Sequence, residues 1–379
     1  EKMPIVGGNT SKSSAGMNAS ETKFQKEAGI EDSNDKFYEE TFKGGKEKND
    51  PELLRFLVDH SASAIDWLDS MNIKLDNLTT TGGMSIKRTH RPSDGSAIGG
   101  YLVEGLYANV TERKIPTFVN SDVTEITEEN GAVSGVKVTV EGQEKTIKSK
   151  AVVLATGGFG ANLDMVSQLK PELKGFVTTN QEGSQGDGIK MAEKLGAQTV
   201  DMDQIQIHPS VEQKTSYLIT EAVRGEGAIL INQEGKRFFN ELETRDKVSA
   251  AIIGQEGKSA YVVFDEALKG RVKAINQYES KGLVVKGDTI EDLAKEIGVD
   301  PANLKASLET WNKAVADKKD KKFSRTTKMD NNLSQAPYYA IKIAPGIHHT
   351  MGGLKINTNA QVLNKENQPI KGLYASGKV

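Results

Sequence analysis

The feature that most constrains the fold is an apolar run that ends in paired glycines. Residues 151–155 are Ala-Val-Val-Leu-Ala, and Thr156, Gly157 and Gly158 follow directly. A buried strand that ends in glycines lets a bound molecule lie against bare backbone. Residues 183–188, Gly-Ser-Gln-Gly-Asp-Gly, open a predicted helix at 189–195, whose N-terminus favours anions. The two segments together predict an α/β fold that holds an anionic cofactor.

The opening residues fit the same kind of fold. Glu1 is followed by a glycine-rich turn at residues 7–10. In a dinucleotide-binding fold, an acidic residue after the second strand takes ribose hydroxyls and the next loop lies against phosphates. The first strand, with its GxGxxG pattern, would stand about 20 residues earlier, and the sequence does not contain it. A plain surface turn explains this opening equally well. The final glycine turn, with no closing helix after it, also suggests truncation.

Local patterns predict several further elements. Residues 15–73 are expected to be mostly helical, and Asp50 before Pro51 is a typical helix start. Alternating apolar residues predict strands at 116–119, 123–126 and 133–138. Asn130-Gly131 predicts a type I′ hairpin turn between two of them.

The later part of the chain alternates short strands with helices. One helix is expected to start at Thr289 and another to span Pro301–Ala316. The charged run at 317–322 is predicted to be solvated. Trp67 and Trp311 are predicted to lie in the core.

Composition excludes several functional classes. The chain of 379 residues has a net charge of -3, which argues against nucleic acid as a partner. Cysteine is absent, which excludes disulfides, cysteine-ligated clusters and cysteine nucleophiles within this chain. With 5 histidines and no HExxH pair, no metal site is predicted. No apolar run of about 18 residues occurs, so no transmembrane segment is predicted.

A dense polar stretch runs from residue 208 to residue 246. It holds a histidine, a threonine–glutamate pair and two arginines, namely His208, Thr220, Glu221, Arg224 and Arg245. Glu221 and Arg224 stand three apart, so one helical turn places both on one face. A second polar group, residues 346–353, contains two adjacent histidines. We predict that the two groups meet around a small anionic substrate.

Several long and irregular strings carry a family resemblance. They are GGNT, SAGMNASET, KRTHRP, ATGGFG, QIQIHPS, TEAVRGEGAIL, NQEGKRFFNELETRD, HHTMGG and GLYASG. Packing gives no reason for such strings to coincide, and they run through essentially the whole chain. The sequence resembles the flavoproteins of the soluble, flavocytochrome c-type fumarate reductases, within the succinate dehydrogenase and fumarate reductase flavoprotein superfamily.

The resemblance implies an α/β fold, α+β overall, in which a capping domain interrupts a Rossmann-like FAD-binding domain. The FAD-binding domain would comprise residues 1–202 and 350–379, without its first strand and C-terminal segment, and the α+β capping domain residues 203–349. The family's motifs place non-covalent FAD contacts at Glu1, Gly8, Asn9, Thr10, Ala15, Gly16, Met17, Thr156, Gly157, Gly158 and Asp187.

The family reduces an activated double bond, so the resemblance implies reduction of a small unsaturated carboxylate, first of all fumarate to succinate. The arginine that matches Arg245 protonates the alkene, and the residues that match Glu221 and Arg224 relay protons to it. Arginine keeps its proton below a pKa of about 12. It therefore acts as an acid only where burial among cations eases proton loss and a carboxylate helps resupply it.

Substrate carboxylates would be bound by the residues that match His208, Thr220 and His349, with Gln206 beside them. Hydride addition builds negative charge on such a carboxylate, so hydrogen-bonding and cationic groups there stabilise the transition state. An extended segment cannot turn two adjacent side chains to one face. His349 is therefore assigned to the substrate and His348 to the structure.

Departures from the family pattern leave the substrate open. Lys378 stands where relatives usually place a glutamate that contacts the flavin, and Thr81 and Leu218 stand where fumarate reductases often carry methionine. The C-terminal segment whose arginine grips a substrate carboxylate is missing. The alternatives are the same chemistry on urocanate or an acrylate-type acid, or a truncated chain that does not bind flavin and is inactive.

Electrons would arrive from outside the chain, because it has no haem or cluster motif. A quinol, a cytochrome, a flavin or another domain is the expected donor. We predict an exported protein, periplasmic or at the cell surface, in preference to a cytoplasmic one.

Overall fold

A computed structural model describes residues 1–80 and 84–379, and the chain divides into two compact units. The first unit comprises Glu1–Phe159, Gln181–Asp201 and Gly352–Val379, and the second comprises Gly160–Asn180 and Met202–Met351. The predicted domains differ from these units chiefly at residues 160–180. Thr179 N donates to Ile347 O at 2.9 Å and Ile347 N donates to Val177 O at 2.8 Å, so backbone pairing ties this segment to the second unit.

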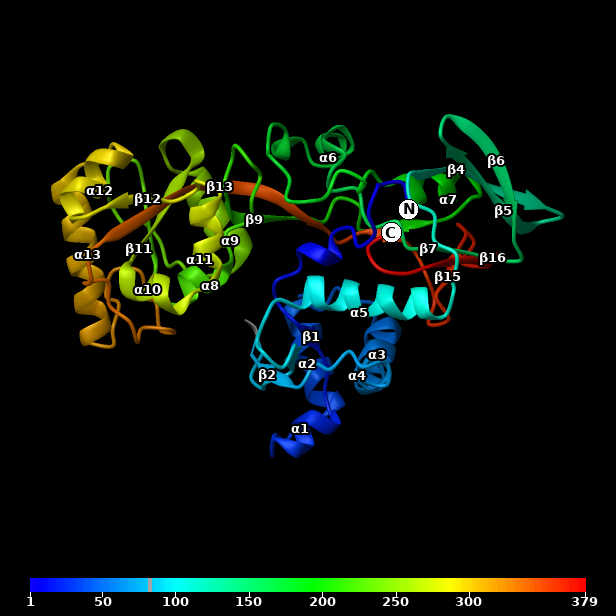
Figure 1. The fold of residues 1–379 in the computed structure, drawn as a ribbon, viewed down its shortest axis with the longest axis horizontal. Coiled ribbons are helices and arrows are strands. Elements are labelled where there is room, and N and C mark those ends of the chain that lie inside the picture. The colour runs from blue at the N-terminus through cyan, green and yellow to red at the C-terminus, as the bar shows by residue number, and fades with distance from the viewer. Residues whose placement is uncertain (81–83) are drawn as a thin grey trace. The chain divides into compact units, whose positions relative to one another are not determined.

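The first unit combines helices with several small sheets (Figure 1). Its helices are α1 (Lys23–Glu27), α2 (Asn34–Gly44), α3 (Pro51–Asp59), α4 (Ser61–Asp69), α5 (Ile98–Glu112) and α7 (Asp187–Lys194), with a 3-10 turn at Thr10–Lys12. Its strands are β1 (Met17–Asn18), β2 (Asn77–Thr79), β3 (Thr89–Arg91), β4 (Ser121–Glu129), β5 (Ala132–Val140), β6 (Gln143–Lys148), β7 (Val152–Leu154), β8 (Thr199–Val200), β14 (Gly353–Leu354), β15 (Gln361–Leu363) and β16 (Pro369–Ala375). Strands β4, β5 and β6 form an antiparallel meander, whereas β16 pairs in parallel with β7.

Local signals explain several of these boundaries. The side chain of Asp50 accepts hydrogen bonds from the first turn of α3, as predicted. Asn130 and Gly131 have φ of 54° and 75°, which confirms the hairpin between β4 and β5. The strand predicted at 116–119 is wrong. Pro116 has no N–H to offer a ladder, and the carbonyl of Phe118 accepts a hydrogen bond from the backbone nitrogen of Glu1 at 3.0 Å.

The core of the first unit is built partly from α4. Ile65 and Leu68 are buried there with residues of α5 and β1. The prediction that Trp67 lies in the core is wrong, because this face of α4 turns outward and leaves the residue 59% exposed.

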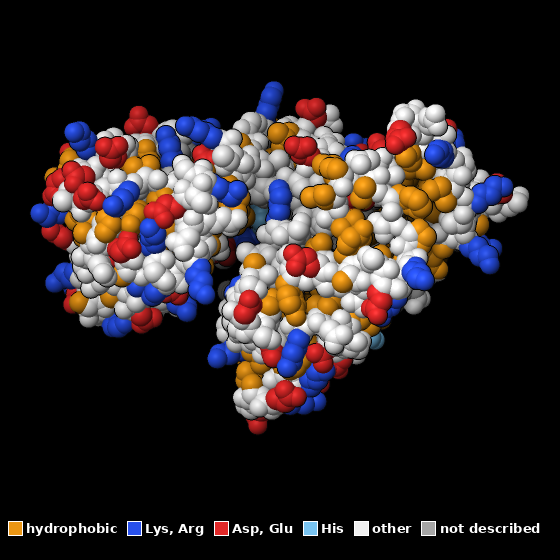
Figure 2. All heavy atoms as spheres, in the orientation of Figure 1, with side chains coloured by type: hydrophobic (Ala, Val, Ile, Leu, Met, Phe, Trp, Pro, Cys, Tyr) orange, Lys and Arg blue, Asp and Glu red, His pale blue; other side chains and the backbone are white. Residues whose placement is uncertain are grey.

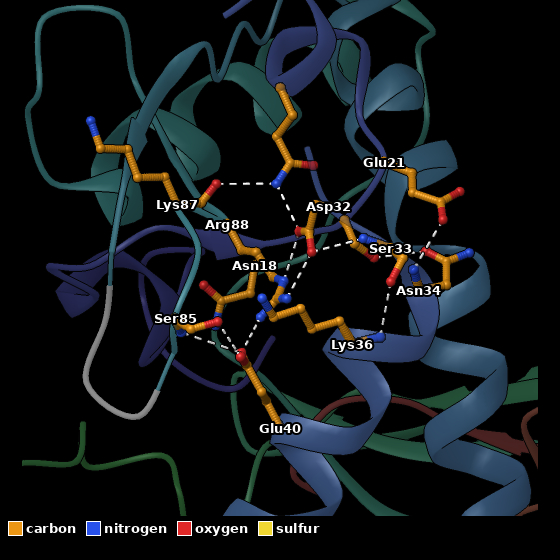
Figure 3. A network of polar contacts seen from close by, with 12 residues as sticks. Asn18, Glu21, Asp32, Ser33, Asn34, Lys36, Glu40, Ser85, Lys87 and Arg88 are labelled. Carbon is orange, nitrogen blue, oxygen red and sulfur yellow. Dashed lines mark hydrogen bonds and ion pairs between the residues drawn. The ribbon is translucent and has the colours of Figure 1, made fainter. Parts of the chain in front are cut away.

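A buried ion-pair network stabilises the start of α2 (Figure 3). Arg88 is fully buried, and its Nε and Nη2 each donate to Asp32 at 2.7 Å. Its Nη1 donates to Glu40 on α2, and Gln25 donates to Asp32 at 2.9 Å. Because the charges are paired and hydrogen-bonded, removal of one partner would leave a buried charge uncompensated, at a cost of about 3–5 kcal/mol.

The second unit is organised around the long strand β13 (Tyr338–Thr350). Strands β10 (Ile229–Ile231), β11 (Ala260–Asp265), β13 and β12 (Val285–Gly287) lie in that order, and β9 (Ile205–Val211) pairs with β13. The helices are α6 (Leu163–Leu169), α8 (Glu221–Gly225), α9 (Arg245–Ile253), α10 (Glu266–Arg271), α11 (Ala274–Ser280), α12 (Ile290–Ile297) and α13 (Pro301–Ala316), with 3-10 turns at Pro171–Leu173 and Glu256–Lys258. Helix α13 has the predicted bounds, and Trp311 is fully buried as predicted.

The charged run at 317–322 is exposed except at one residue. Asp320 is buried and lies 2.8 Å from the guanidinium of Arg237, so the prediction of a solvated run is wrong at this position. Arg237 lies about eighty residues earlier in the sequence, so the local charge pattern around Asp320 cannot reveal this partner.

Figure 2 shows Lys and Arg side chains interspersed with Asp and Glu over the visible face. Within the described parts of the chain, no helix has the length and apolar character needed to cross a membrane. The same residues include no group of three or more His, Cys, Asp or Glu that could hold a metal ion.

Candidate active site

The predicted catalytic residues are brought together within the second unit. Gln206 and His208 lie on β9, and Thr220 caps the short helix α8, which carries Glu221 and Arg224. Arg245 is the first residue of α9, and His348 and His349 lie near the end of β13. Antiparallel pairing of β13 with β9 places Gly346 opposite His208. The polar group at residues 346–353 therefore lies next to the start of the polar stretch at residues 208–246.

Glu221 is the centre of this cluster. Its Oε1 accepts a hydrogen bond of 2.7 Å from Arg245 Nε. The same oxygen lies 3.8 Å from Arg224 Nη2 and 3.7 Å from His208 Nε2. Arg245 Nη1 also donates to Gln206 Oε1 at 2.7 Å. Three nitrogen-bearing side chains therefore converge on one carboxylate oxygen.

The guanidinium of Arg224 is buried and makes few hydrogen bonds. Only 3% of its side chain is exposed, and its Nε has no hydrogen-bond partner among the described residues. Burial lowers the pKa of Arg224 to about 10, a shift that the carboxylates of Glu221 and Glu241 oppose. A buried arginine with a lowered pKa releases its proton more readily than one in water.

The pKa of Glu221 lies below its ordinary value. Burial raises this pKa, but the hydrogen bond and charge of Arg245 and the charge of Arg224 outweigh that effect. The carboxylate is therefore ionised at neutral pH and can accept a proton only transiently.

His208 is neutral at physiological pH. Burial, together with the charges of Arg245 and Arg224, lowers its pKa well below 6.5. Ser210 N donates to His208 Nδ1 at 3.2 Å, so in the neutral ring the proton lies on Nε2, the nitrogen nearer to Glu221. His208 therefore offers a hydrogen-bond donor without a charge.

Of the two adjacent histidines, His348 lies beside His208. The ring of His348 lies edge-on to that of His208, with centroids 5.3 Å apart, and its Nδ1 is 2.8 Å from the hydroxyl of Thr179. A register shift between Ile347 and His349 makes His348 a bulge residue, so alternation along an extended strand did not apply. His348 is therefore a further candidate, beside the predicted His349, for the histidine of the cluster.

Thr220 has a partner that the sequence did not reveal. Its backbone N–H donates to the hydroxyl of Tyr278 at 3.0 Å, and its side chain caps α8. Tyr278 lies on α11, about sixty residues away, and no spacing pattern links the two. Leu218 is paired with Val211 in the same unit, whereas Thr81 lies outside the described residues.

The predicted FAD contacts lie in the first unit, where three segments meet. Asn9 Oδ1 accepts from Gln181 N at 2.8 Å, and Asn9 Nδ2 donates to Ser184 Oγ at 3.1 Å. Gly186 N donates to Gly158 O at 3.2 Å. Residues 7–10, 156–158 and 181–188 are thus held together by hydrogen bonds.

The backbone of these turns fits a flavin dinucleotide. Gly8 and Gly157 have φ of +49° and +72°, and a Cβ on Gly157 would fill space in which the nearest side-chain atom is Ser184 Oγ at 3.8 Å. Asp187 begins α7 and accepts from Lys2 Nζ at 2.5 Å, which brings residue 2 to a helix N-terminus.

The remaining predicted contacts are less directly connected. Glu1 Oε1 accepts from Met3 N at 2.9 Å in an exposed turn. Met17 pairs with His90 in the β1–β3 ladder, and Gly16 packs against the carbonyl of His90. Met17 is therefore held by this ladder, with Gly16 packed against it.

Comparison with known proteins identifies the family. A model described as "FAD binding domain" matches residues 1–379. The chain belongs to this FAD-binding family. An NADH:fumarate oxidoreductase of Klebsiella pneumoniae is 53% identical over 380 residues, which is 100% of this chain and 41% of that protein. A fumarate reductase (cytochrome) of Shewanella frigidimarina is 43% identical over 383 residues, with 100% and 66% covered.

A solved structure shares the fold. The open conformation of a flavocytochrome c3 fumarate reductase matches with a TM-score of 0.88 and 42% identity, covering 100% of this chain and 67% of that one. The predicted fold class and the resemblance to the fumarate reductase flavoprotein superfamily are therefore confirmed, and so is FAD as the cofactor of the family. The chain spans less than two thirds of the length of these two curated relatives.

Proposed function

We propose that this protein is a flavin-dependent reductase of a small unsaturated carboxylate, and that it reduces fumarate to succinate. The observation that supports this most strongly is the hydrogen bond of 2.7 Å from Arg245 to Glu221, with Arg224 3.8 Å from the same oxygen. It links two arginines through one carboxylate, as a proton relay requires. The names of the Klebsiella and Shewanella relatives support fumarate as the substrate.

Reduction of the alkene needs one hydride and one proton, and FAD, when bound, supplies the hydride. Arg245 donates the proton to the other alkene carbon. Its Nε and Nη1 are engaged by Glu221 and Gln206, which leaves Nη2 for the substrate. Proton donation leaves the guanidine of Arg245 neutral. Glu221, which is ionised at rest, takes a proton from Arg224 and passes it to the neutral guanidine of Arg245.

The substrate carboxylates would be held by His208, the hydroxyl of Thr220 and one histidine of β13. We now assign this last role to His348 in place of His349, because the ring of His348 lies beside His208. A neutral Nε2–H on His208 can donate to a carboxylate whose charge grows as hydride adds. Gln206 orients Arg245.

The proposed function requires a bound FAD and an external source of electrons. FAD would be held non-covalently by the backbone turns of the first unit that contain Gly8, Asn9, Gly157 and Gly158. Electrons would come from an external donor, such as a quinol, a cytochrome, a flavin or another domain, and the name of the Klebsiella relative adds NADH as their source. We also propose that the protein is exported, to the periplasm or to the cell surface.

The proposal is tested by a substrate panel. Protein that shows the flavin absorption band near roughly 450 nm is supplied with reduced viologen and with fumarate, urocanate or acrylate. We expect the highest kcat/KM with fumarate, at least tenfold above the other acids. A higher value with urocanate or acrylate would reassign the substrate, and no turnover with any acid would overturn the proposal.

A further inference from the structure

Behind the catalytic cluster lies a second group of buried charges. Glu241 is fully buried, and its carboxylate accepts from Arg237 Nε and Nη2 at 2.6 and 2.8 Å and from Arg325 Nη1 at 3.1 Å. The backbone N–H of Leu230 donates to the same carboxylate at 3.3 Å. None of these residues was singled out for catalysis by the sequence, since the partners lie up to 84 positions apart.

Arg325 joins this group directly to Arg224. Its side chain is fully buried, and one arm of the guanidinium donates to the carboxylate of Glu241 while the other donates to the backbone carbonyl of Arg224 at 2.9 Å. The planar fork of arginine can hold two acceptors in fixed directions, which the single ammonium of lysine cannot do.

The side chain of Arg224 is tied to the same group. Its Nη1 donates to the backbone carbonyl of Glu241. Arg224 is thus held at its backbone by Arg325 and at its guanidinium by Glu241. On the other side, Nη2 lies 3.8 Å from Glu221.

The helix that carries Arg224 needs such support. Helix α8 has only five residues, Glu221–Gly225, and helices of this length are not stable by themselves. A free arginine side chain also has many rotamers to lose. Without outside contacts, its guanidinium would not stay near one carboxylate oxygen.

We propose that Arg325 and Glu241 are positioning residues that hold the guanidinium of Arg224 within reach of Glu221. The inference rests on the proposed function, because it gives these residues a part in resupplying the proton of Arg245. The alternative is that the buried network only stabilises the fold.

The charges of the network act on Arg224 as well. The charged and titratable groups that face it are His208, Glu221, Glu241, Arg245 and Arg325. Glu241 raises the pKa of Arg224, and Arg325 lowers it. Loss of the Arg325 charge should therefore raise this pKa, and loss of the Glu241 charge should lower it further.

Arg224 must be protonated to supply protons, so turnover should fall as the pH rises through its pKa. Arg325→Gln is expected to move this alkaline limb of kcat to higher pH, and Glu241→Gln to lower pH. Arg325→Lys keeps the charge but loses the planar fork that holds two acceptors. We therefore expect kcat to fall, while the pH at which kcat declines stays the same. A purely structural role predicts none of these shifts.

The matched control is Asp320→Asn. Asp320 is also buried and pairs with Arg237 at 2.8 Å, but among the described residues it makes no hydrogen bond or ion pair with Arg224, Glu241 or Arg325. It should lower the melting temperature while kcat per bound flavin stays within about twofold of the parent, since its loss leaves the relay contacts intact.

The experiment measures kcat, KM, flavin content and melting temperature for the flavin-loaded protein that contains this chain, between pH 7 and 11. We expect kcat per bound flavin to fall at least tenfold in Arg325→Lys and Arg325→Gln, with KM within twofold. If Arg325→Gln does not fold, the downward shift in Glu241→Gln provides the same test.

The possible failures are distinguishable. One result would be a lower kcat per bound flavin in Arg224→Lys than in the parent, while both Arg325 variants have the same kcat as Asp320→Asn. In that case the positioning role is wrong and the proposed function stands. If the parent reduces no unsaturated acid, the proposed function fails and this inference fails with it.

Discussion

Arg245 and Glu221 are joined by a hydrogen bond of 2.7 Å from Nε to Oε1, although they stand 24 positions apart in the sequence. The contact connects the first residue of α9 to the first residue of α8. A proton can therefore pass between the two side chains without any rearrangement of the backbone.

Replacement of Glu221 by glutamine should slow the reaction without weakening substrate binding. The amide keeps the shape of the side chain but cannot take up and return a proton. General acid–base groups contribute roughly 10²–10⁴-fold to rate, so we expect kcat to fall by about 10²- to 10³-fold while KM changes little. Steady-state kinetics on flavin-loaded protein measure both.

The control for this variant is Glu226→Gln. Glu226 lies just after α8 and pairs with Arg271 on the protein surface at 3.2 Å. Its replacement should leave kcat within a factor of about two, because an exposed ion pair contributes under about 1 kcal/mol. Equal losses in the two variants would mean that Glu221 acts only through local structure.

The two histidines of β13 should differ in their effect on substrate binding. His348 lies beside His208, so His348→Gln should raise KM for the substrate about tenfold or more, the loss expected for one charge-assisted hydrogen bond. His349→Gln should raise it less. Titration of oxidised protein with succinate measures the same difference without turnover. A larger effect from His349 would restore the assignment made from the sequence.

The sequence predicted what depends on local chemistry. The helix starts at Asp50 and Thr289, the hairpin at Asn130 and the full length of α13 follow from capping, turn and periodicity rules that act over a few residues. The family strings directed attention to Glu221, Arg224 and Arg245, but they did not show the distances among them.

What escaped prediction depends on contacts between distant segments. The bulge at His348 arises from how β13 pairs with β9, and alternation within one strand cannot reveal it. The charge run at 317–322 predicts a solvated Asp320, because its partner, Arg237, lies far away in the sequence. Glu241 and Arg325 had no motif of their own, and only their burial and their shared contacts with Arg224 mark them.

Lowering the pH should destabilise the second unit through His208. Its pKa in the folded protein lies well below 6.5 because the ring is buried beside Arg245 and Arg224. Below pH 6.5, His208 binds a proton in the unfolded chain but not in the folded protein. The free energy of unfolding therefore decreases as the pH falls below 6.5, and His208 does not affect it above that pH. The loss has a limit of about 1.4 kcal/mol per pH unit.

Urea unfolding at pH 7.5 and pH 5.5 measures this effect. The free energy of unfolding should fall more in the parent than in His208→Gln, by roughly 1 kcal/mol. An equal fall in both proteins would show that another group is responsible.

Flavin binding should depend on a glycine in α5. A Cβ on Gly99 would lie 2.3 Å from the carbonyl oxygen of Thr10 and 2.7 Å from that of Ser13. Gly99→Ala should therefore displace the turn that follows Gly8 and lower the ratio of bound FAD to protein severalfold. The absorbance ratio of flavin to protein measures this.

Gly100→Ala is the matched control for that substitution. A Cβ at Gly100 meets nothing within 4 Å among the described residues, so flavin content should not change. Stability should rise by about 0.5–1 kcal/mol, since alanine is favoured over glycine inside a helix. If both variants bind FAD normally, the turn before Ser13 is not part of the flavin site.

The central claim is that Arg245 delivers the proton to the substrate. Fumarate turnover by Arg245→Ala, measured with the flavin still bound and reduced, tests it most directly. We predict a loss of at least about 10³-fold in kcat, because both the proton donor and its link to Glu221 are removed. Retention of half the parent rate would contradict the account.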